Sequence, residues 1–368
     1  MTHHIVVIGA GYAGLTAANR LARRLSPGQA QVTLVNAAGT FLERVRLHQV
    51  AAGQAVPEPA VTDLARGARF VRGRVESITA DRRELRLGST TMRYDTLVYA
   101  AGSVADLEGA PGVAEHALTV SGTGDTTRLR DRVARIPAGG VLTVVGAGPT
   151  GIEVAAELAE SHRRLRVRLL AAEDPGGRWS PAARAHLRRA FDRLGVEVMT
   201  GAKVVRVDAS GARLADGRSV GSDAVVWAAG FRAPALAREA GLAVDGHDRV
   251  LVDRTARSIS HPDVYAVGDA AAVRASSGQE LRMACATALP AGRQAADAIA
   301  DRINGREPGP LRFRYVVQCV SLGRRDGLIQ FVHADDRPRA MTLTGRSAAL
   351  VKELVVRNAL RSAQRGGG

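Results

Sequence analysis

The chain has few of the residues that mark several classes of protein. Its 368 residues include only two cysteines, Cys285 and Cys319, and aromatic residues make up 4% of it. Two cysteines cannot form the framework of a small disulfide-bonded domain, and they fit a reducing compartment. No apolar run approaches the roughly 18 residues of a membrane-spanning helix, and no basic segment precedes an apolar run at the start. We therefore expect a cytoplasmic protein.

Lysine is nearly absent, although the chain is strongly basic. Lys203 and Lys352 are the only lysines among 51 basic residues, and the formal net charge is +15. A nucleic-acid-binding protein concentrates basic residues on one element among aromatic side chains, whereas these arginines are spread along the chain. We expect no nucleic-acid partner. The charge can still attract anionic cofactors or an anionic lipid surface.

Glycine is abundant, with 40 residues, and it recurs in two equivalent patterns. Each pattern is an apolar run, a Gly-x-Gly-x-x-Gly turn and a helical segment; the turns are Gly9-Ala10-Gly11-Tyr12-Ala13-Gly14 and Gly146-Ala147-Gly148-Pro149-Thr150-Gly151. The first glycine permits the tight turn, the second admits a pyrophosphate, and the third lets helix and strand pack closely. Because each turn lies between a strand and a helix, the chain is predicted to bind two dinucleotides.

Further segments repeat between the two halves. Apolar strands end in Ala-Ala-Gly at residues 97–102 and 224–230, and residues 264–269 form a strand that delivers Asp269 at its end. This repetition indicates an internal duplication. Residues 70–78 alternate like one antiparallel strand. We predict an α/β fold with two tandem Rossmann-like domains and a small C-terminal α/β cap, divided as 1–112 with 243–304, 113–242 and 305–368.

These motifs resemble the FAD/NAD(P)-dependent pyridine nucleotide-disulfide oxidoreductase superfamily over roughly residues 4–332. The resemblance implies a glutathione-reductase-like fold, with FAD at the first turn and NADH or NADPH at the second. Within the superfamily, the segment Phe41–Gly53 is similar to the type II NADH dehydrogenase (NADH:quinone oxidoreductase) branch. Disulfide reductases carry two cysteines five positions apart in this place. Here Cys285 and Cys319 lie 34 positions apart, so we expect no dithiol relay.

The resemblance also implies which residues bind the cofactors. Those expected at FAD are Gly9, Gly11, Tyr12, Ala13, Gly14, Asn36, Arg44, Arg46, Val75, Ala101, Gly102, Gly268, Asp269 and Ala286. Those expected at the nicotinamide dinucleotide are Gly146, Gly148, Pro149, Thr150, Gly151, Glu173, Ala229 and Gly230. Ala171 stands where a carboxylate would reject a 2′-phosphate, so the sequence leaves NADH and NADPH open. No metal site is expected.

Two residues are candidates for catalysis. Glu153 follows the second turn, at a position that the resembled branch places by the nicotinamide and flavin; the alternative is a carboxylate that only stabilises a helix N-terminus. His48 can supply a proton when an acceptor takes two electrons, because imidazole titrates near neutral pH. A structural role for His48 is equally compatible with the sequence.

The expected activity is hydride transfer from NAD(P)H to flavin N5, then electron transfer to a quinone or a quinone-like aromatic acceptor. Where the branch has Ala-Gln-x-Ala, this chain reads Ala288-Leu289-Pro290-Ala291. Three alternatives stay open: a reductase of a ferredoxin-type protein, a biosynthetic tailoring oxidoreductase, and a slow redox sensor. Gln318 and Cys319 are candidates for the acceptor pocket.

The C-terminal helical segment, residues 348–360, combines an apolar stripe with arginines. Such a helix can lie on a membrane surface, here the inner face of the cell membrane. It can equally pack on its own domain or form a homodimer interface.

Overall fold

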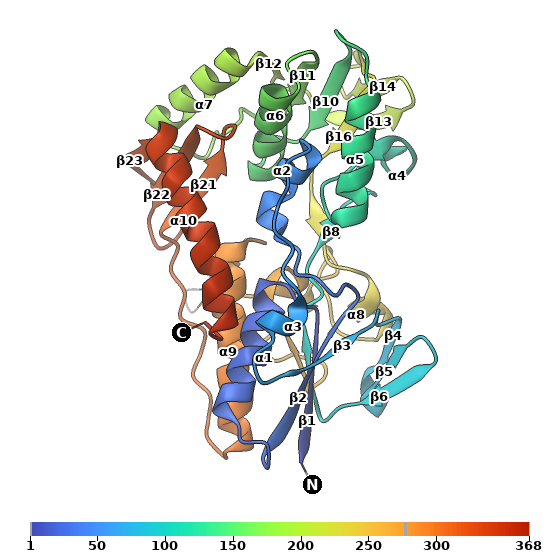
Figure 1. Cartoon of the computed structure of the whole chain (residues 1–368), viewed down its shortest axis with the longest axis vertical. Coiled ribbons are helices and arrows are strands. Elements are labelled where there is room, and N and C mark those ends of the chain that lie inside the picture. Colours follow the sequence, from blue (N-terminus) through green and yellow to red (C-terminus); the bar gives the residue numbers. More distant parts are fainter. Residues whose placement is uncertain (1, 276–277, 368) are drawn as a thin grey trace.

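The computed structural model describes residues 2–275 and 278–367, and its lower half in Figure 1 is built on a five-stranded parallel sheet. The strand order is β19-β7-β1-β2-β3. The strands are β1 (His3–Ile8), β2 (Ala30–Asn36), β3 (Arg69–Arg72), β7 (Thr96–Tyr99) and β19 (Val264–Ala266). Helices α1 (Tyr12–Arg24) and α9 (Cys285–Ile303) pack against each other beside this sheet and share its core.

The upper half repeats this arrangement around a second parallel sheet, in the order β12-β11-β10-β16-β9. Its strands are β9 (Ala117–Leu118), β10 (Val141–Val145), β11 (Arg166–Leu170), β12 (Val196–Met199) and β16 (Ala224–Trp227). Its helices are α5 (Thr123–Arg135), α6 (Pro149–Ser161) and α7 (Pro181–Leu194). The predicted α/β fold with two tandem Rossmann-like units is confirmed.

Smaller elements complete both halves. Two antiparallel sheets are β4 (Ser77–Thr79) with β5 (Glu84–Leu87) and β6 (Thr90–Arg93), and β13 (Val204–Asp208) with β14 (Gly211–Leu214) and β15 (Ser219–Gly221). Two-stranded pairs are β8 (Val104–Ala105) with β17 (Phe231–Arg232), and β18 (Val250–Leu251) with β20 (Ala271–Ala272). The short helices are α3 (Val61–Leu64), α4 (Val113–His116) and α8 (Leu236–Glu239), and the 3-10 turns are Arg44–Arg46, Ala80–Arg82 and Gly268–Ala270.

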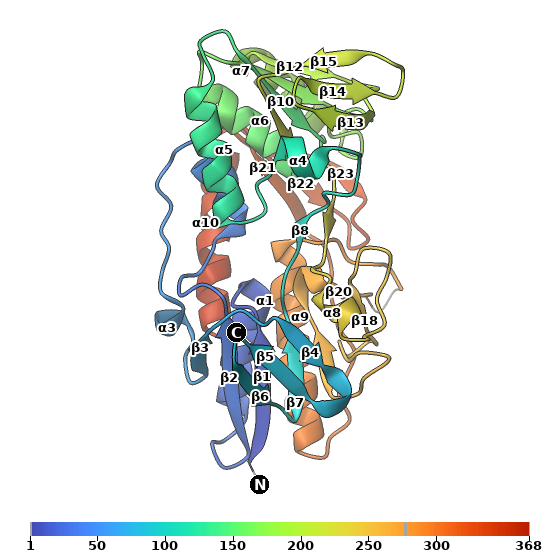
Figure 2. The ribbon, with the colours of Figure 1, turned by 90° about the vertical axis from the view of Figure 1, so that its right-hand side faces the viewer.

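The C-terminal segment bridges the two halves. Strands β21 (Val317–Ser321), β22 (Gly327–Val332) and β23 (Pro338–Thr344) form an antiparallel sheet, and α10 (Gly345–Gln364) follows. Figures 1 and 2 show α10 running from this sheet down to α1 and α9. Its Ala363 is buried in the lower core, whereas Val320 and Leu328 of the cap strands are buried in the upper core. The segment therefore shares the cores of both units.

Helix α2 (Leu47–Ala51) crosses in the opposite direction. It follows β2 in the chain, yet its Leu47 and Ala51 are buried in the upper core, where the helix packs against α5 and α6. Burying one leucine side chain contributes about 1.5–3 kcal/mol. This packing fixes His48, the next residue after Leu47, beside α6.

One predicted strand is wrong. Residues 70–78 were expected to form a single antiparallel strand, but β3 pairs in parallel with β2, and β4 belongs to the separate antiparallel sheet. Gly73 lies between them, against the Leu87 side chain. The domain boundaries stay a prediction. Among the described residues, no helix is both long enough and apolar enough to cross a bilayer.

Candidate active site

The first glycine-rich turn joins β1 to α1, and its glycines differ in what surrounds them. A Cβ on Gly9 would lie 2.3 Å from the Ala100 carbonyl oxygen, and one on Gly14 would lie 1.9 Å from the Gly9 oxygen. A Cβ on Gly11 would meet nothing within 4 Å. A side chain at the first or third glycine would therefore clash with the backbone where strand and helix pack, whereas the second glycine lies beside open space. No side chain caps α1 at Gly11, so its first N–H groups are available to a phosphate.

The second turn, between β10 and α6, has the same geometry. A Cβ on Gly146 would lie 2.8 Å from backbone atoms of Ala228, and one on Gly151 would lie 1.8 Å from the Gly146 oxygen. Gly148 again faces open space, and no side chain caps α6 there. Pro149 occupies the first helical turn, where its missing N–H costs nothing. Both turns therefore fit a dinucleotide pyrophosphate.

One cavity of about 460 Å³ joins the two turns. Of the residues predicted at the cofactors, it is lined by Tyr12, Arg44, Asp269, Ala286, Gly148, Pro149, Thr150 and Gly230. Both predicted catalytic residues, Glu153 and His48, line it too. Much of the remaining wall is apolar and comes from Val45, Leu47, Val120, Phe231, Met283, Val317, Val320, Val355, Val356 and Ala359.

A polar chain lies on the first-turn side of the cavity. The Arg44 guanidinium donates to the Ser103 carbonyl oxygen at 2.5 Å, and the Ser103 hydroxyl donates to Asp269 at 2.8 Å. Burial lowers the pKa of Arg44, and the Asp269 carboxylate opposes that shift. Gly102, with φ +72°, turns the backbone beside Arg44. This arrangement holds a cation and an anion together at the cavity wall.

The other predicted binding residues support the turns or lie elsewhere. Ala13, Ala101 and Gly268 surround the first turn, because a Cβ on Gly268 would lie 3.0 Å from that of Ala13 and one on Gly9 would lie 3.4 Å from the Ala101 Cα. Ala229 is placed equivalently, next to the Cβ position of Gly146. Each of these residues therefore lies where the backbone approaches a turn.

Asn36, at the end of β2, accepts from the Ala10 backbone N–H at 3.0 Å and donates to the Ala38 oxygen at 2.8 Å. Arg46 pairs with Glu43 and Glu353 and does not line the cavity. Val75 packs against an apolar cluster behind the sheet, and Glu173 is exposed on the loop after β11. Cofactor contacts of these four residues remain predictions.

Glu153 is held by a buried cluster that the sequence analysis did not find. Its carboxylate accepts from the Ser321 backbone N–H at 3.0 Å and from the Lys352 ammonium, which also donates to the Ser321 hydroxyl at 2.7 Å. Burial opposes ionisation, but Lys352 and His48 outweigh it and lower the pKa of Glu153 below its ordinary 4.5. The carboxylate therefore serves a tertiary ion pair rather than the N-terminus of α6.

His48 lies against the other face of the same carboxylate. Its Nδ1 is 3.6 Å from Glu153 Oε2, and the side chain is 4% exposed. Burial lowers the pKa of His48 to about 4, against the opposing effect of Glu153. The imidazole is therefore neutral at pH 7, with one nitrogen able to donate a proton and the other able to accept one.

The two cysteines meet at this cavity despite their separation in sequence. Cys285 begins α9 and Cys319 lies in β21; both line the cavity, and both thiols are free. Burial raises the pKa of Cys285 to about 11 and also raises that of Cys319. The neighbouring Gln318 lines the cavity and accepts from the Trp179 indole N–H at 2.9 Å. The predicted absence of a dithiol relay stays a prediction.

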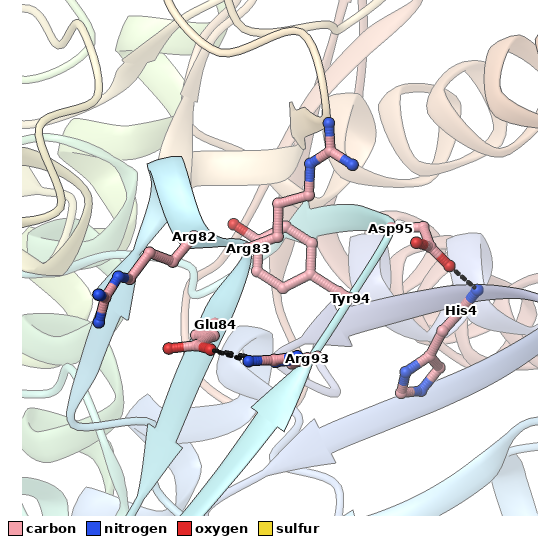
Figure 3. Close-up of a pocket in the computed structure, with 7 residues that line it drawn as sticks. All are labelled: His4, Arg82, Arg83, Glu84, Arg93, Tyr94 and Asp95. Carbon is pink, nitrogen blue, oxygen red and sulfur yellow. Dashed lines mark hydrogen bonds and ion pairs between the residues drawn. The ribbon is translucent and has the colours of Figure 1, made fainter.

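A second hollow, of about 540 Å³, lies outside the lower sheet (Figure 3). Its lining residues include several charged side chains, but most of these charges are already paired. Arg93 pairs with Glu84, Arg83 pairs with Asp263, and Asp95 accepts from the His4 backbone N–H. No glycine-rich turn is among the described residues that line it. We therefore take the cavity between the two turns as the candidate active site.

Sequence patterns gave no signal for Lys352, Ser321 or Ser103. Lys352 is 199 positions from Glu153 and lies in an otherwise ordinary helical pattern. Its rarity was the available hint, because it is one of two lysines in an arginine-rich chain. Residues 2–275 and 278–367 contain no group of His, Cys, Asp and Glu that could hold a metal ion.

Comparison with known proteins agrees with this geometry. The model of the pyridine nucleotide-disulphide oxidoreductase family matches residues 3–295. An NADH dehydrogenase-like protein of Mycobacterium tuberculosis (strain ATCC 25618 / H37Rv) is 31% identical over 375 residues, covering 95% of this chain and 92% of that protein. A type II NADH:quinone oxidoreductase of Staphylococcus haemolyticus is 25% identical over 385 residues, covering 95% and 93%.

Two solved structures share the fold. The sulfide:quinone oxidoreductase of Aquifex aeolicus superposes with a TM-score of 0.81 at 18% identity, over 99% of this chain and 92% of the other. The NDH2 of Plasmodium falciparum in complex with NADH gives 0.81 at 14% identity, over 99% and 96%. The family match confirms the predicted enzyme class and the cofactor pair of FAD with a nicotinamide dinucleotide. The chain belongs to the pyridine nucleotide-disulphide oxidoreductase family.

Proposed function

We propose that this protein is an FAD-dependent NADH dehydrogenase that reduces a quinone. The observation that carries the proposal is the single cavity between the two dinucleotide turns, because it combines an extensive apolar wall with a buried proton-active cluster. An apolar aromatic acceptor fits the wall. The relatives named NADH dehydrogenase-like protein and type II NADH:quinone oxidoreductase support the same reading.

Bound FAD would supply the two-electron chemistry that the side chains lack. The open space at Gly11 and the N-terminus of α1 would hold its pyrophosphate, with Arg44 and Asp269 nearby. Gly148 and the N-terminus of α6 would hold the nicotinamide dinucleotide. Reduction of a quinone to a quinol consumes two electrons and two protons. The nicotinamide hydride carries both electrons and one proton, so the second proton comes from solvent through the protein. We propose that Glu153 and His48 transfer it.

The choice of donor gives a first prediction. Arg168, on the second nucleotide unit, pairs with Glu197 at 2.9 Å, which reduces its charge toward a 2′-phosphate. We therefore expect NADH to reduce the bound flavin faster than NADPH does. Anaerobic stopped-flow absorbance of the yellow protein with each donor measures both rates.

A flavin that neither donor bleaches within minutes would contradict the proposed function. A faster NADPH rate would contradict the expected donor choice instead. The exposed Arg178 would then be the first residue to replace, with Arg178→Ala expected to remove the preference. The same measurement on Arg168→Ala separates the two arginines.

We also propose that α10 lays one face on an anionic membrane surface. Leu350, Val351, Leu354 and Val355 form an exposed apolar stripe, of which Leu350 is 67% exposed. Arg346, Arg357 and Arg361 are exposed on the same helix. Val355 also lines the cavity, so a lipid-soluble acceptor would enter directly from the surface that α10 covers.

Replacing Leu350 and Leu354 by aspartate is expected to reduce binding to anionic phospholipid vesicles at least about tenfold, because two large apolar contacts are lost. Co-sedimentation with the vesicles measures this. Ile259→Asp is the matched control, since Ile259 is 62% exposed in a loop of the lower half. Unchanged vesicle binding, or a purified dimer that the double replacement dissociates, would assign the stripe to another partner.

A further inference from the structure

Beside the cavity, two buried polar atoms that face each other have no hydrogen-bond partner among the residues that the structure describes. They are His48 Nε2 and Glu157 Oε2. The Glu157 side chain is 0% exposed, and the two atoms face each other at 3.9 Å. A buried polar atom without a hydrogen bond destabilises the folded state, so two of them facing each other call for a functional explanation.

The His48 ring lies between two carboxylates. Its Nδ1 faces Glu153 at 3.6 Å and its Nε2 faces Glu157 at 3.9 Å. Glu153 and Glu157 are four residues apart on α6 and so share one helix face. Only Glu153 lines the cavity. The imidazole therefore connects a carboxylate inside the cavity with one outside it.

The outer carboxylate leads toward solvent. Glu157 Oε1 accepts from the Gln54 amide at 2.5 Å, and Glu157 Oε2 lies 3.8 Å from the Arg324 guanidinium. The Arg324 side chain is 40% exposed, in the turn between β21 and β22. The side chains of Glu153, His48, Glu157 and Arg324 thus form a continuous series in space from the cavity to the surface.

Burial and the charges around the ring keep His48 neutral between proton transfers. Burial lowers the pKa of His48; the Glu153 carboxylate opposes this, and Lys352, Arg324 and Arg46 reinforce it. Burial raises the pKa of Glu157, which Gln54 and Arg324 partly offset. A neutral ring beside a readily protonated carboxyl group can accept a proton at Nε2 and release one from Nδ1.

We propose that His48 and Glu157 form a proton path that carries the solvent proton to Glu153 during reduction of the acceptor. A proton passes from Glu157 to His48 Nε2, the Nδ1 proton passes to Glu153, and Glu157 is reprotonated from solvent beside Arg324. No electrons move along this path. Distances of 3.6 and 3.9 Å close to hydrogen-bond length by small side-chain rotations, as is common when a site engages its substrate. The inference rests on the proposed function, because only a proton-consuming acceptor needs the path.

Glu157→Gln in the FAD-loaded protein tests the path. The reduced enzyme is mixed anaerobically with a soluble quinone, or with ferricyanide, which takes one electron and no proton. We expect oxidation by the quinone to slow at least about tenfold with an increased solvent isotope effect. Reduction by NADH and oxidation by ferricyanide should stay within about twofold of wild type, since neither requires delivery of a proton to an acceptor. Added formate should partly restore the quinone rate.

Glu160→Gln is the matched control, because Glu160 lies on the same helix and accepts from the Arg324 backbone N–H at 2.6 Å, away from His48. It should behave as wild type. Glu157→Asp retains a carboxyl group and should recover part of the quinone rate, which guards against misfolding of the glutamine variant. An unchanged quinone rate in Glu157→Gln, or equal losses with quinone and ferricyanide, would overturn the path. A wild-type protein that oxidises NADH with ferricyanide but with no quinone would instead overturn the proposed function, and the need for the path with it.

Discussion

Replacing Glu153 by glutamine is expected to slow oxidation of the reduced enzyme by a quinone by about 10²–10⁴-fold, the range for loss of a positioned proton-transfer group. The replacement removes the carboxylate that faces both Lys352 and His48 in the cavity. Rapid mixing of the reduced variant with a quinone measures the rate. Reduction by NADH should fall far less, because hydride transfer needs no proton from Glu153.

The pH dependence of the quinone rate of the wild-type protein also tests the role of the Glu153 carboxylate. Lys352 and His48 lower the pKa of Glu153 despite its burial. The carboxylate that receives protons therefore persists as the pH falls, and is lost only below the ordinary carboxyl value of 4.5. We expect the quinone rate to show no acid limb from Glu153 between pH 5 and 8 (roughly the range in which most proteins stay folded).

A double replacement separates proton chemistry from charge burial. Glu153→Gln leaves the Lys352 ammonium buried without its carboxylate, which destabilises the protein. Adding Lys352→Met removes that charge and should recover thermal stability without recovering the quinone rate. If activity returned together with stability, Glu153 would be only a structural partner of Lys352.

Replacing Gly151 by valine is expected to lower the rate of flavin reduction by NADH at least about 100-fold, as expected for misplacement of a bound reactant. A Cβ there would lie 1.8 Å from the Gly146 oxygen, so the second turn must open. The purified variant should remain yellow, because the first turn is untouched. Gly14→Val is the matched counterpart: its Cβ would lie 1.9 Å from the Gly9 oxygen, and it should lose the flavin itself.

A second pair of variants keeps folding apart from binding. Gly11 and Gly148 face open space, so a valine at either position disturbs no protein atom within 4 Å of the added Cβ. Gly148→Val should therefore unfold at the wild-type temperature yet bind NADH poorly. Gly11→Val should bind FAD poorly and unfold at the temperature of wild-type protein from which the flavin has been removed, because a bound cofactor stabilises the folded state. If Gly148→Val emptied the flavin site, or Gly11→Val spared it, the assignment of the two turns would be reversed or wrong.

Much of the site was predictable because its signals are local. Gly9 and Gly146 each begin a turn whose spacing is dictated by atoms within the same strand-turn-helix unit. Asp269 lies in the 3-10 turn that follows the short apolar strand β19, and that strand takes its place in the first sheet beside β7. The alternating pattern of residues 70–78 misled, because alternation does not reveal which sheet a strand will join. There, β3 extended the parallel sheet instead.

By itself, the sequence determined the two dinucleotide-binding units, their order and the cavity residues contributed by the turns, since backbone sterics and strand-helix periodicity act over a few neighbouring residues. Only the tertiary structure decided which side chains meet Glu153. His48 arrives because α2 packs into the upper core, and Lys352 arrives because α10 spans both units. Such contacts depend on the packing of helices from distant parts of the chain. Periodicity identifies the buried face of a helix but not the helix that will cover it.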